Sequence, residues 1–476
     1  MCHCHSATGR LILKAQPVVN LLKQTPDIQA LIQQDAEVLL HPASSITQLL
    51  ENGPQMITSA SGCRITDADG NSLLDTVAGL WCVNVGYGRK ELADAMQEAA
   101  TQLGYYHTFA NASNPWQVQL AAKLIELSPP HLTKVFFGNS GSDCNDTIIK
   151  IAWHYHFLQG KTKKIKIISR QQAYHGTSIS TASLTGLSAF HKEFPIPLDF
   201  VLHTDCPHYY SKALENESEE AFCDRMIDNI EALIDREGAD TIAAFFAEPI
   251  QGAGGIIVPP EGYFPRLRKL LTANDILLVA DEVITGYGRT GEWFASNAFG
   301  IEPDMIASAK ALTSGYFPMS AAFISQEIWE VLKMGSEKLG AFSHGYTYSG
   351  HPVGAAVALA NLDIHEREGL VPRAKEMGDY LHQQLQSLLN LPMVGEVRGK
   401  GLLAAVQLVA DKGSRELHDP TLKIPHQIAA EMRAKGVIVR PLPSIGALAI
   451  SPPLTISIDE IDELVQALTD TISAHS

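Results

Sequence analysis

A lysine that follows a short, largely apolar stretch is the first residue of this chain with the capacity for unusual chemistry. Lys310 comes directly after residues 305–309, and small residues follow it as far as Gly315. An ammonium at the end of a buried strand must be desolvated or paired, and desolvation lowers its pKa. A lysine that is neutral near pH 7 can form a Schiff base with a carbonyl group. The alternative is a lysine whose long side chain reaches the solvent.

A carboxylate occupies the same kind of position one predicted strand earlier. Asp281 and Glu282 follow the apolar run 276–280. A buried carboxylate is costly unless a cation or strong hydrogen-bond donors meet it. A protonated ring nitrogen is one such cation. A structural salt bridge, for example to Arg289, is the alternative.

Two further motifs could bind other parts of a flat, anionic ligand. Residues 138–143 (Gly-Asn-Ser-Gly-Ser-Asp) precede a predicted helix, whose N-terminal amide groups and dipole attract anions. The alternative is a plain helix N-cap at Ser140 or Ser142. Tyr174, which begins the Tyr-His-Gly motif at 174–176, could stack on a heterocycle, although a tyrosine after a strand often only packs.

Three other patterns have simpler explanations than the sites they suggest. Residues 286–291 match the dinucleotide pattern G-x-G-x-x-G, but they follow two carboxylates that would repel a pyrophosphate. The lysines within 161–166 are better explained as a solvated loop before a strand than as an anion site. Residues 2–5 (Cys-His-Cys-His) offer good metal ligands, but four adjacent residues wrap a tetrahedral ion poorly. We therefore predict no metal site.

The elements that must position these residues alternate short β-branched runs with longer amphipathic stretches, which is typical of βαβ units. Such units predict an α/β fold with an open, mainly parallel sheet that is covered on both faces. Strands are predicted at residues 135–137, 165–169, 241–247, 276–280, 305–309 and 321–324. Helices between them are predicted at residues 143–157, 220–236 and 265–273.

The two chain ends are expected to build a smaller α+β domain. Turn signals separate short strand-like runs over 52–75, further strands are predicted within 395–408 and at 436–440, and helices are predicted at 425–435 and 459–474. The predicted division is an N-terminal segment with part of the small domain (1–78), a large domain (79–348) and a C-terminal small domain (349–476). A cleft between such lobes is a common place for a ligand.

The composition limits the partners and the compartment. The 476 residues include 36 Lys and Arg against 52 Asp and Glu, a formal net charge of −16, which repels nucleic acids and anionic membrane surfaces. The chain has no uncharged apolar stretch long enough to span a bilayer. Its seven scattered cysteines do not look like a disulfide framework. We expect a cytoplasmic protein that binds neither nucleic acid nor membranes.

Taken together and in this order, these features resemble the class III aminotransferases, which use pyridoxal 5'-phosphate (PLP) and have PLP fold type I, the aspartate aminotransferase-like fold. The resemblance covers nearly the whole chain. The matching motifs are residues 41–42, 79–81, 138–143, 174–176, 247–249, 281–283, Lys310, 344–352, Arg440 and 451–453. Residues 206–210, 238–248 and 317–319 look most like the ω-transaminases of the amine:pyruvate type.

The resemblance implies a role for each matching residue. Lys310 would carry the cofactor and shuttle a proton, Asp281 would pair with the ring nitrogen, and Glu248 would support the pocket. The residues expected to bind the cofactor are Ser140, Gly141, Ser142, Tyr174, Glu248, Asp281, Val283, Lys310 and Thr347. Thr347 would come from the neighbouring subunit, so the resemblance implies a homodimer with shared active sites, which could pair further into a tetramer.

The resemblance also implies the substrates. Trp81, Phe109 and Tyr174 would line a pocket for the amine, and Arg440 matches a mobile arginine that binds the carboxylate of a keto acid. The implied reaction is a ping-pong transfer of an amino group from a primary amine or ω-amino compound to a keto acid such as pyruvate.

Other functions on this fold stay open at this point. Racemases and aminomutases share the fold and its lysine, and a PLP-fold protein can serve as a scaffold without activity. The intact Lys310 and Asp281 speak against a scaffold. The chain departs from the family at Asp143, where Glu is usual, and at Ala112, where the best-matching relatives have an arginine. The loop after Arg440 also looks slightly longer, so the substrate assignments are weaker than those for the cofactor.

Overall fold

The structure is a computed structural model that describes residues 27–475. The Cys-His segment at residues 2–5 lies outside the described residues. Contacts divide the chain into one unit of residues 1–59 and 66–72 and another of residues 60–65 and 73–476. The first unit contains helices α2 (Ile28–Val38) and α3 (Ile46–Asn52), which are capped by the side chains of Asp27 and Ser45. Most of strand β1 (Ile57–Ser61) and part of β2 (Arg64–Asp67) also belong to it.

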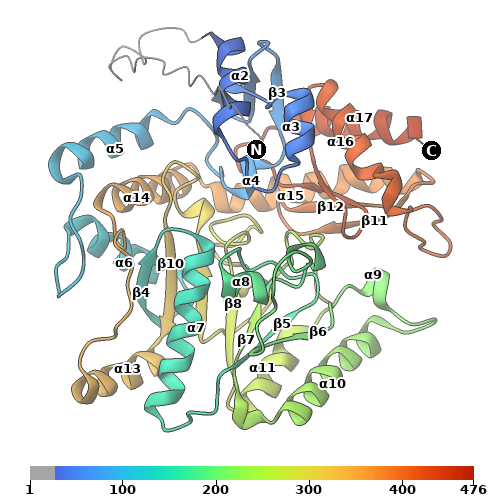
Figure 1. Cartoon of the computed structure of the whole chain (residues 1–476). Helices are drawn as coiled ribbons and strands as arrows, with labels where there is room; N and C mark the ends of the chain where they lie inside the picture. Colours follow the sequence, from blue (N-terminus) through green and yellow to red (C-terminus); the bar gives the residue numbers. More distant parts are fainter. Residues whose placement is uncertain (1–26, 476) are drawn as a thin grey trace, which may run out of the picture. The chain divides into compact units, whose positions relative to one another are not determined.

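A seven-stranded sheet forms the centre of the second unit (Figure 1). Its strand order is β4-β10-β9-β8-β7-β5-β6. The strands are β4 (Leu132–Gly138), β5 (Lys166–Arg170), β6 (Val201–Thr204), β7 (Ile242–Ala247), β8 (Leu277–Asp281), β9 (Met305–Ser308) and β10 (Ser320–Ser325). β10 is antiparallel to both of its neighbours, and the other neighbouring pairs are parallel. The predicted mainly parallel sheet is confirmed, and only the short edge strand β6 was missed.

Helices cover both faces of this sheet, because alternate side chains of each strand point to opposite layers. In β7, Ala244 and Phe246 pack in one core cluster with residues of α7, whereas Phe245 and Ala247 pack with α10 and α11. One layer contains α7 (Gly141–Leu158), α8 (Ile179–Leu184) and α13 (Gln326–Leu339). The other contains α6 (Pro115–Leu127), α10 (Glu219–Glu237), α11 (Tyr263–Ala273) and α14 (Pro352–Arg367).

A second core joins segments from both parts of the sequence. It packs Leu74, Val85 and Leu92 with side chains from three C-terminal helices. These are α15 (Leu370–Leu385), α16 (Ile424–Ala434) and α17 (Ile458–His475). The core also includes a four-stranded antiparallel sheet of β11 (Val394–Gly399), β12 (Ala404–Leu408), β15 (Ala447–Ile450) and β14 (Arg440–Leu442). The domain boundaries at residues 78 and 348 stay a prediction.

The remaining elements connect these cores. β13 (Val437–Ile438) pairs in parallel with β3 (Ser72–Asp75) through Leu74 and Val437. The other helices of this unit are α4 (Ala78–Trp81), α5 (Lys90–Leu103), α9 (Tyr209–Lys212) and α12 (Ala295–Ala298). Within residues 27–475, no helix is both long and apolar enough to cross a membrane.

The interpretation of the 161–166 lysines as a solvated loop was wrong for one of them. Lys164 is only 5% exposed. Its ammonium donates to the main-chain carbonyls of Ala239, Ile242, Asn274 and Asp275, at 2.7–3.3 Å. These carbonyl oxygens take the place of water around the buried cation and offset the free-energy cost of its desolvation.

Candidate active site

The predicted site residues gather at one edge of the central sheet. Ser140 follows β4, Tyr174 follows β5, Glu248 follows β7, Asp281 ends β8 and Lys310 follows β9. These strands run in the same direction, so their carboxyl ends meet where open α/β sheets bind ligands. A cavity of about 120 Å³ lies there, and it is lined by Gly141, Ser142, Tyr174, His175, Gly176, Glu248, Asp281, Val283, Ile284 and Lys310.

Asp281 is held rigidly at this cavity. Its Oδ2 atom lies 2.8 Å from His175 Nδ1 and accepts a 2.8 Å hydrogen bond from Asn145 Nδ2. Its Oδ1 atom accepts a 3.1 Å bond from the main-chain N–H of Val283. The carboxylate is therefore buried and fixed in orientation, with one side toward the cavity. The alternative of a salt bridge to Arg289 was wrong.

Arg289 serves a different part of the structure. It is fully buried in the 286–291 loop. Its guanidinium donates to Asn84 Oδ1 at 2.6 Å and to the main-chain carbonyls of Leu402 and Pro452. The G-x-G-x-x-G pattern thus marks a loop that anchors other segments of the chain, and the dinucleotide interpretation has no support.

Lys310 enters the cavity from a turn that begins where β9 ends. Burial lowers the pKa of its ammonium, and this effect exceeds the opposing influence of Cys82, Asp281 and Glu248. Its Nζ atom lies 5.3 Å from the centre of the Trp81 ring. The side chain is partly buried and lines the cavity beside Trp81 instead of extending into open solvent, and burial favours the neutral form of the amine.

The 138–143 loop combines a helix cap with a space for an anion. The Ser140 hydroxyl accepts a 3.2 Å bond from Asp143 N–H, and the Asp143 carboxylate accepts a 2.9 Å bond from Ser140 N–H, which is a capping box. Ser140 is thus occupied as the N-cap and does not line the cavity. Gly141 and Ser142 do line it, and a Cβ atom on Gly141 would come within 3.0 Å of Val283. Their amide groups begin the helix, where no intrahelical acceptor is available.

Glu248 lines the cavity and binds main-chain groups of its wall. Its carboxylate accepts bonds from the main-chain N–H groups of Tyr174 (2.9 Å) and Gly252 (2.8 Å). Burial raises its pKa. These two bonds hold the backbone that presents the Tyr174 ring, so Glu248 orients one wall of the site.

Trp81 and Arg440 form a pair above Lys310. The guanidinium carbon of Arg440 lies 4.7 Å from the centre of the Trp81 ring, within range of a cation–π contact. Burial lowers the pKa of Arg440, and Tyr174 acts in the opposite direction. Within the described chain, no carboxylate pairs with this guanidinium, and its Nε atom is buried without a hydrogen-bond partner.

Phe109 and Thr347 do not line the cavity of their own chain. Phe109 is 46% exposed, and its ring comes within 3.1 Å of the position that a Cβ atom on Gly345 would take. The Tyr105 hydroxyl donates a 2.9 Å bond to the main-chain carbonyl of Thr347. The segments that contain Phe109 and Thr347 therefore pack against each other.

The family model for class III aminotransferases matches residues 48–472. The chain belongs to the class III aminotransferases. A diaminobutyrate–2-oxoglutarate transaminase of Halomonas elongata is 43% identical, over 91% of this chain and 94% of that protein. A γ-aminobutyrate transaminase of Solanum lycopersicum is 39% identical, over 90% of this chain and 83% of that protein.

Solved structures show the same relationship. The ω-transaminase from Pseudomonas jessenii, in complex with PMP, has a TM-score of 0.91 and 41% identity, and the match covers 93% of this aminotransferase and 98% of that chain. An (S)-enantioselective ω-transaminase from Thermomicrobium roseum has the same score and identity, over 95% of this chain and 99% of that one. The predicted fold type I is confirmed. An isomerase or a scaffold is not favoured, because the relatives are transaminases.

The cavity of this aminotransferase fits PLP, the cofactor that its family uses. The N-terminus of α7 suits the phosphate, Tyr174 and Val283 offer the two walls for the ring, and Asp281 offers an anion to the ring nitrogen. Once bound, the cofactor supplies an electron sink for the carbon that loses its proton. Among the described residues, the buried Asp281 carboxylate has no lysine or arginine partner of its own, which is an arrangement that a cationic ring would complete.

The residues of the aminotransferase would then divide the work. Lys310 would hold the cofactor through its Nζ atom, and the same amine would be the base that accepts the substrate proton and returns it. Asp281 would keep the ring nitrogen protonated. Trp81 would cover the amine of Lys310 and exclude water, while Arg440 would orient a carboxylate.

Two residues that shape this site were not predicted from the sequence. His175 lies in the Tyr-His-Gly motif, but the motif was used only for its tyrosine. Asn145 lies near the start of α7, where nothing in the sequence shows that its amide faces Asp281. Both residues contact the same oxygen of Asp281, Oδ2, and fix its position.

Proposed function

We propose that this aminotransferase is an ω-transaminase that moves an amino group from a primary amine or ω-amino compound to a keto acid, with pyruvate as the acceptor. The observation that carries the proposal is the half-buried guanidinium of Arg440, which stands beside Trp81 and near Lys310 without a carboxylate partner among residues 27–475. A partly desolvated guanidinium of this kind binds a carboxylate bidentately. Its long side chain on the rim strand β14 can also withdraw when the amine is apolar.

The charges around Lys310 favour a monocarboxylate acceptor. Among the groups that act most strongly on its amine, Asp281 and Glu248 are carboxyl groups and Arg440 is the single guanidinium. A dicarboxylate would need a second cation, and desolvating an unpaired carboxylate is costly. Pyruvate therefore suits the pocket better than 2-oxoglutarate, the acceptor in the name of the Halomonas elongata relative.

Replacing Arg440 by Leu tests this proposal. We expect kcat/KM for pyruvate to fall about 100-fold, because two charge-assisted hydrogen bonds to the carboxylate are lost. The first half-reaction with 1-phenylethylamine, followed by the bleaching of the cofactor absorbance in a stopped-flow instrument, should change less than about threefold, since that amine has no carboxylate. The wild-type enzyme should prefer pyruvate to 2-oxoglutarate.

Arg398 provides the matched control. It is a buried arginine of β11, but its guanidinium is bonded to Glu396, Gln407 and the carbonyl of Gly255. Arg398→Leu should lower the thermal midpoint and leave the KM for pyruvate in place. Equal losses in both half-reactions of Arg440→Leu would contradict a role in carboxylate recognition.

The site is proposed to be completed by a second copy of the chain. Exposed apolar side chains lie in the same segments as Phe109 and Thr347, as expected of a surface that is buried in a dimer. They include Tyr105 (42%), Tyr106 (52%) and Tyr348 (57%), and Tyr105 packs edge-on against Tyr348. In a homodimer with two-fold symmetry, Thr347 would reach the phosphate and Phe109 the amine pocket of the other subunit. Sedimentation velocity would distinguish a dimer from a tetramer.

Mixed dimers provide the test of sharing. Lys310→Ala and Thr347→Asp should each be nearly inactive, the second because its carboxylate repels the phosphate. Co-expressed in equal amounts, they should recover about a quarter of wild-type activity, since half of the dimers are hybrids and each hybrid has one intact site of two. The control is the pair Lys310→Ala and Asp281→Asn, whose residues belong to the same subunit's site and which should recover nothing. No recovery with the first pair would contradict a shared site.

A reducing compartment, the cytoplasm, is also proposed. Cys63, Cys82, Cys144, Cys206 and Cys223 are free thiols in the described part of the chain, and most of them are buried. Such thiols persist where disulfides do not form.

A further inference from the structure

The turn that presents Lys310 has a backbone that must be held in place. Lys310 has φ = 47° and Ser314 also has φ = 47°, so two residues with side chains occupy the left-handed region within one short turn. This conformation is unfavourable for residues other than glycine and persists only when the surroundings enforce it. The turn itself is a single 3-10 turn (Lys310–Leu312), which has few bonds of its own.

Asn361 supplies the restraint. It lies on α14 and is completely buried. Its Nδ2 atom donates to the carbonyls of Ala311 (2.9 Å) and Leu312 (3.0 Å), the two residues that follow Lys310. Its Oδ1 atom accepts a 2.7 Å bond from the Ser314 hydroxyl. Because carbonyl oxygens only accept, the amide has one possible orientation, and it clamps both ends of the turn.

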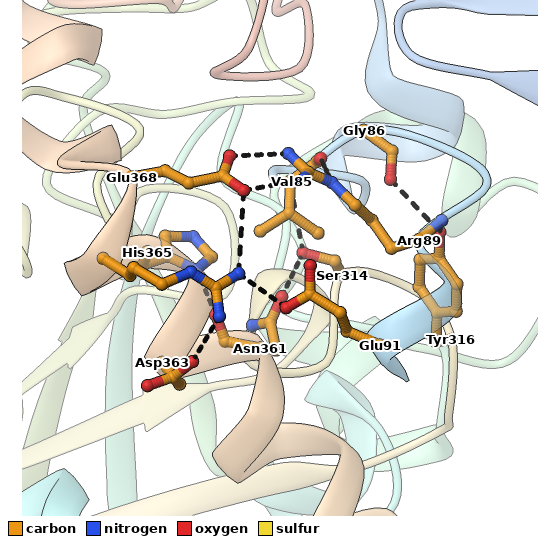
Figure 2. Close-up of polar contacts among 11 residues, drawn as sticks. Val85, Gly86, Arg89, Glu91, Ser314, Tyr316, Asn361, Asp363, His365 and Glu368 are labelled. Carbon is orange, nitrogen blue, oxygen red and sulfur yellow. Dashed lines mark hydrogen bonds and ion pairs between the residues drawn. The ribbon is translucent and has the colours of Figure 1, made fainter. Parts of the chain in front are cut away.

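The same cluster ties this turn to the segment that follows Trp81 (Figure 2). The Ser314 hydroxyl accepts a 3.3 Å bond from Val85 N–H. The Tyr316 hydroxyl accepts a 2.8 Å bond from Arg89 N–H and donates to the carbonyl of Gly86. Figure 2 shows Ser314 between Asn361 and Val85, and Tyr316 next to Gly86 and Arg89. The network therefore joins the segment that follows Lys310 to the segment that follows Trp81.

An ion pair closes the network at the end of α14. The guanidinium of Arg89 donates two parallel bonds to the carboxylate of Glu368, at 2.7 and 2.8 Å (Figure 2). Glu368 follows the last residue of the helix. The C-terminus of α14, the helix that carries Asn361, is thus attached to the segment that follows Trp81. The helix is therefore fixed in position next to the Lys310–Leu312 turn.

We propose that Asn361 is a positioning residue for catalysis, which holds the amine of Lys310 against Trp81 by clamping the carbonyls of Ala311 and Leu312. The inference rests on the proposed role of Lys310. Without the clamp, Lys310 can relax to an ordinary backbone conformation, and its side chain leaves the geometry that the reaction needs. Misplacement of a reacting group by about 1 Å can cost 10²-fold in rate.

Asn361→Leu tests this inference, because leucine fills a similar volume and removes both donors. We expect kcat to fall about 10- to 100-fold while KM changes less than about twofold. A second readout uses the cofactor-free enzyme: Lys310 is labelled with a water-soluble amine-acylating reagent at a series of pH values and quantified by peptide mass spectrometry. The midpoint should move to higher pH in the variant, since a released lysine regains solvent and burial no longer depresses its pKa.

A purely structural role for Asn361 predicts different results. Leu468→Ala, a cavity variant in the buried core of α17, is the control for lost stability alone. It should lower the thermal midpoint without changing either the labelling profile or kcat. If Asn361→Leu behaves in the same way as Leu468→Ala, the inference is overturned.

A milder variant keeps the test decisive if Asn361→Leu does not fold. Ser314→Ala removes the hydroxyl that fixes Asn361 Oδ1, and it should shift the labelling midpoint and kcat in the same directions by smaller amounts. Unchanged values in that folded variant would also overturn the inference. Because labelling reports on the amine itself, its outcome is separate from whether Lys310 is the catalytic lysine, which the Lys310→Ala variant decides.

Discussion

The Lys310→Ala enzyme is expected to retain less than about one part in 10⁴ of the turnover of a primary amine with pyruvate. The variant loses the amine that would attach the cofactor and also the base that would move the substrate proton. Neither task has an obvious substitute, because Lys310 is the only amine that lines the cavity within residues 27–475. The other acid–base groups there are Tyr174, His175, Glu248 and Asp281. Steady-state rates of ketone formation, measured with added PLP, provide the check.

Lys164 is the matched control for this experiment. It is also a buried lysine, but its ammonium is bonded to main-chain carbonyls far along the sheet from the cavity. Lys164→Ala should lower the thermal midpoint, because those carbonyls lose their donor, and should retain its activity per folded subunit. Near-normal ketone formation by Lys310→Ala would contradict the assignment of Lys310 as the catalytic lysine.

The residues predicted best from the sequence are the charged ones whose burial costs the most free energy. Asp281 and Lys310 each follow an apolar strand, and a charge in that position requires a partner, so the position itself indicated function. The same strands run parallel in the sheet, which brings their ends together without further information. The fold class and the principal site residues could therefore be predicted before any distance was known.

Residues that act through other residues could not be found in this way. Asn145 and Asn361 carry no unusual sequence context, and His175 lies in a motif that was used only for its tyrosine. The importance of all three comes from the atoms that they face in three dimensions. Asn361 in particular lies on a helix far along the chain from Lys310, and only the packing of α14 against the catalytic turn reveals the contact.

Side chains whose partners lie far along the chain were also difficult to assign from the sequence. Lys164 was predicted to be solvated because its neighbours are lysines, but carbonyl oxygens from distant loops surround it. Arg289 was considered as a partner for Asp281 because the two are close in sequence, but its guanidinium points to Asn84 and Leu402. Ser140 was expected to contact the cofactor, and its hydroxyl accepts the cap bond of α7, so its contact with the cofactor stays a prediction. In each case the competing partner comes from elsewhere in the fold.

Asp281→Asn is expected to lower kcat about 10²- to 10³-fold, the range found when a single preorganised electrostatic group is removed from an active site. The substitution is nearly isosteric, so the bond from Val283 N–H can persist while the negative charge beside the ring is lost. The ring nitrogen would then lose its proton more readily, and the electron sink would weaken. The measurement is the rate of the first half-reaction, together with cofactor retention after gel filtration.

The neighbouring carboxylate, Glu282, provides the control for Asp281→Asn. Glu282 is also fully buried, but it accepts bonds from Thr285, from Ala295 N–H and from Ser296, and it does not line the cavity. Burial raises its pKa, as it does for other enclosed carboxylates. Glu282→Gln should therefore cost thermal stability with little loss of kcat. If the two variants lose kcat equally, the effect of Asp281 is structural; a large loss confined to Asp281→Asn, in an enzyme that still retains its cofactor, places the charge at the ring nitrogen.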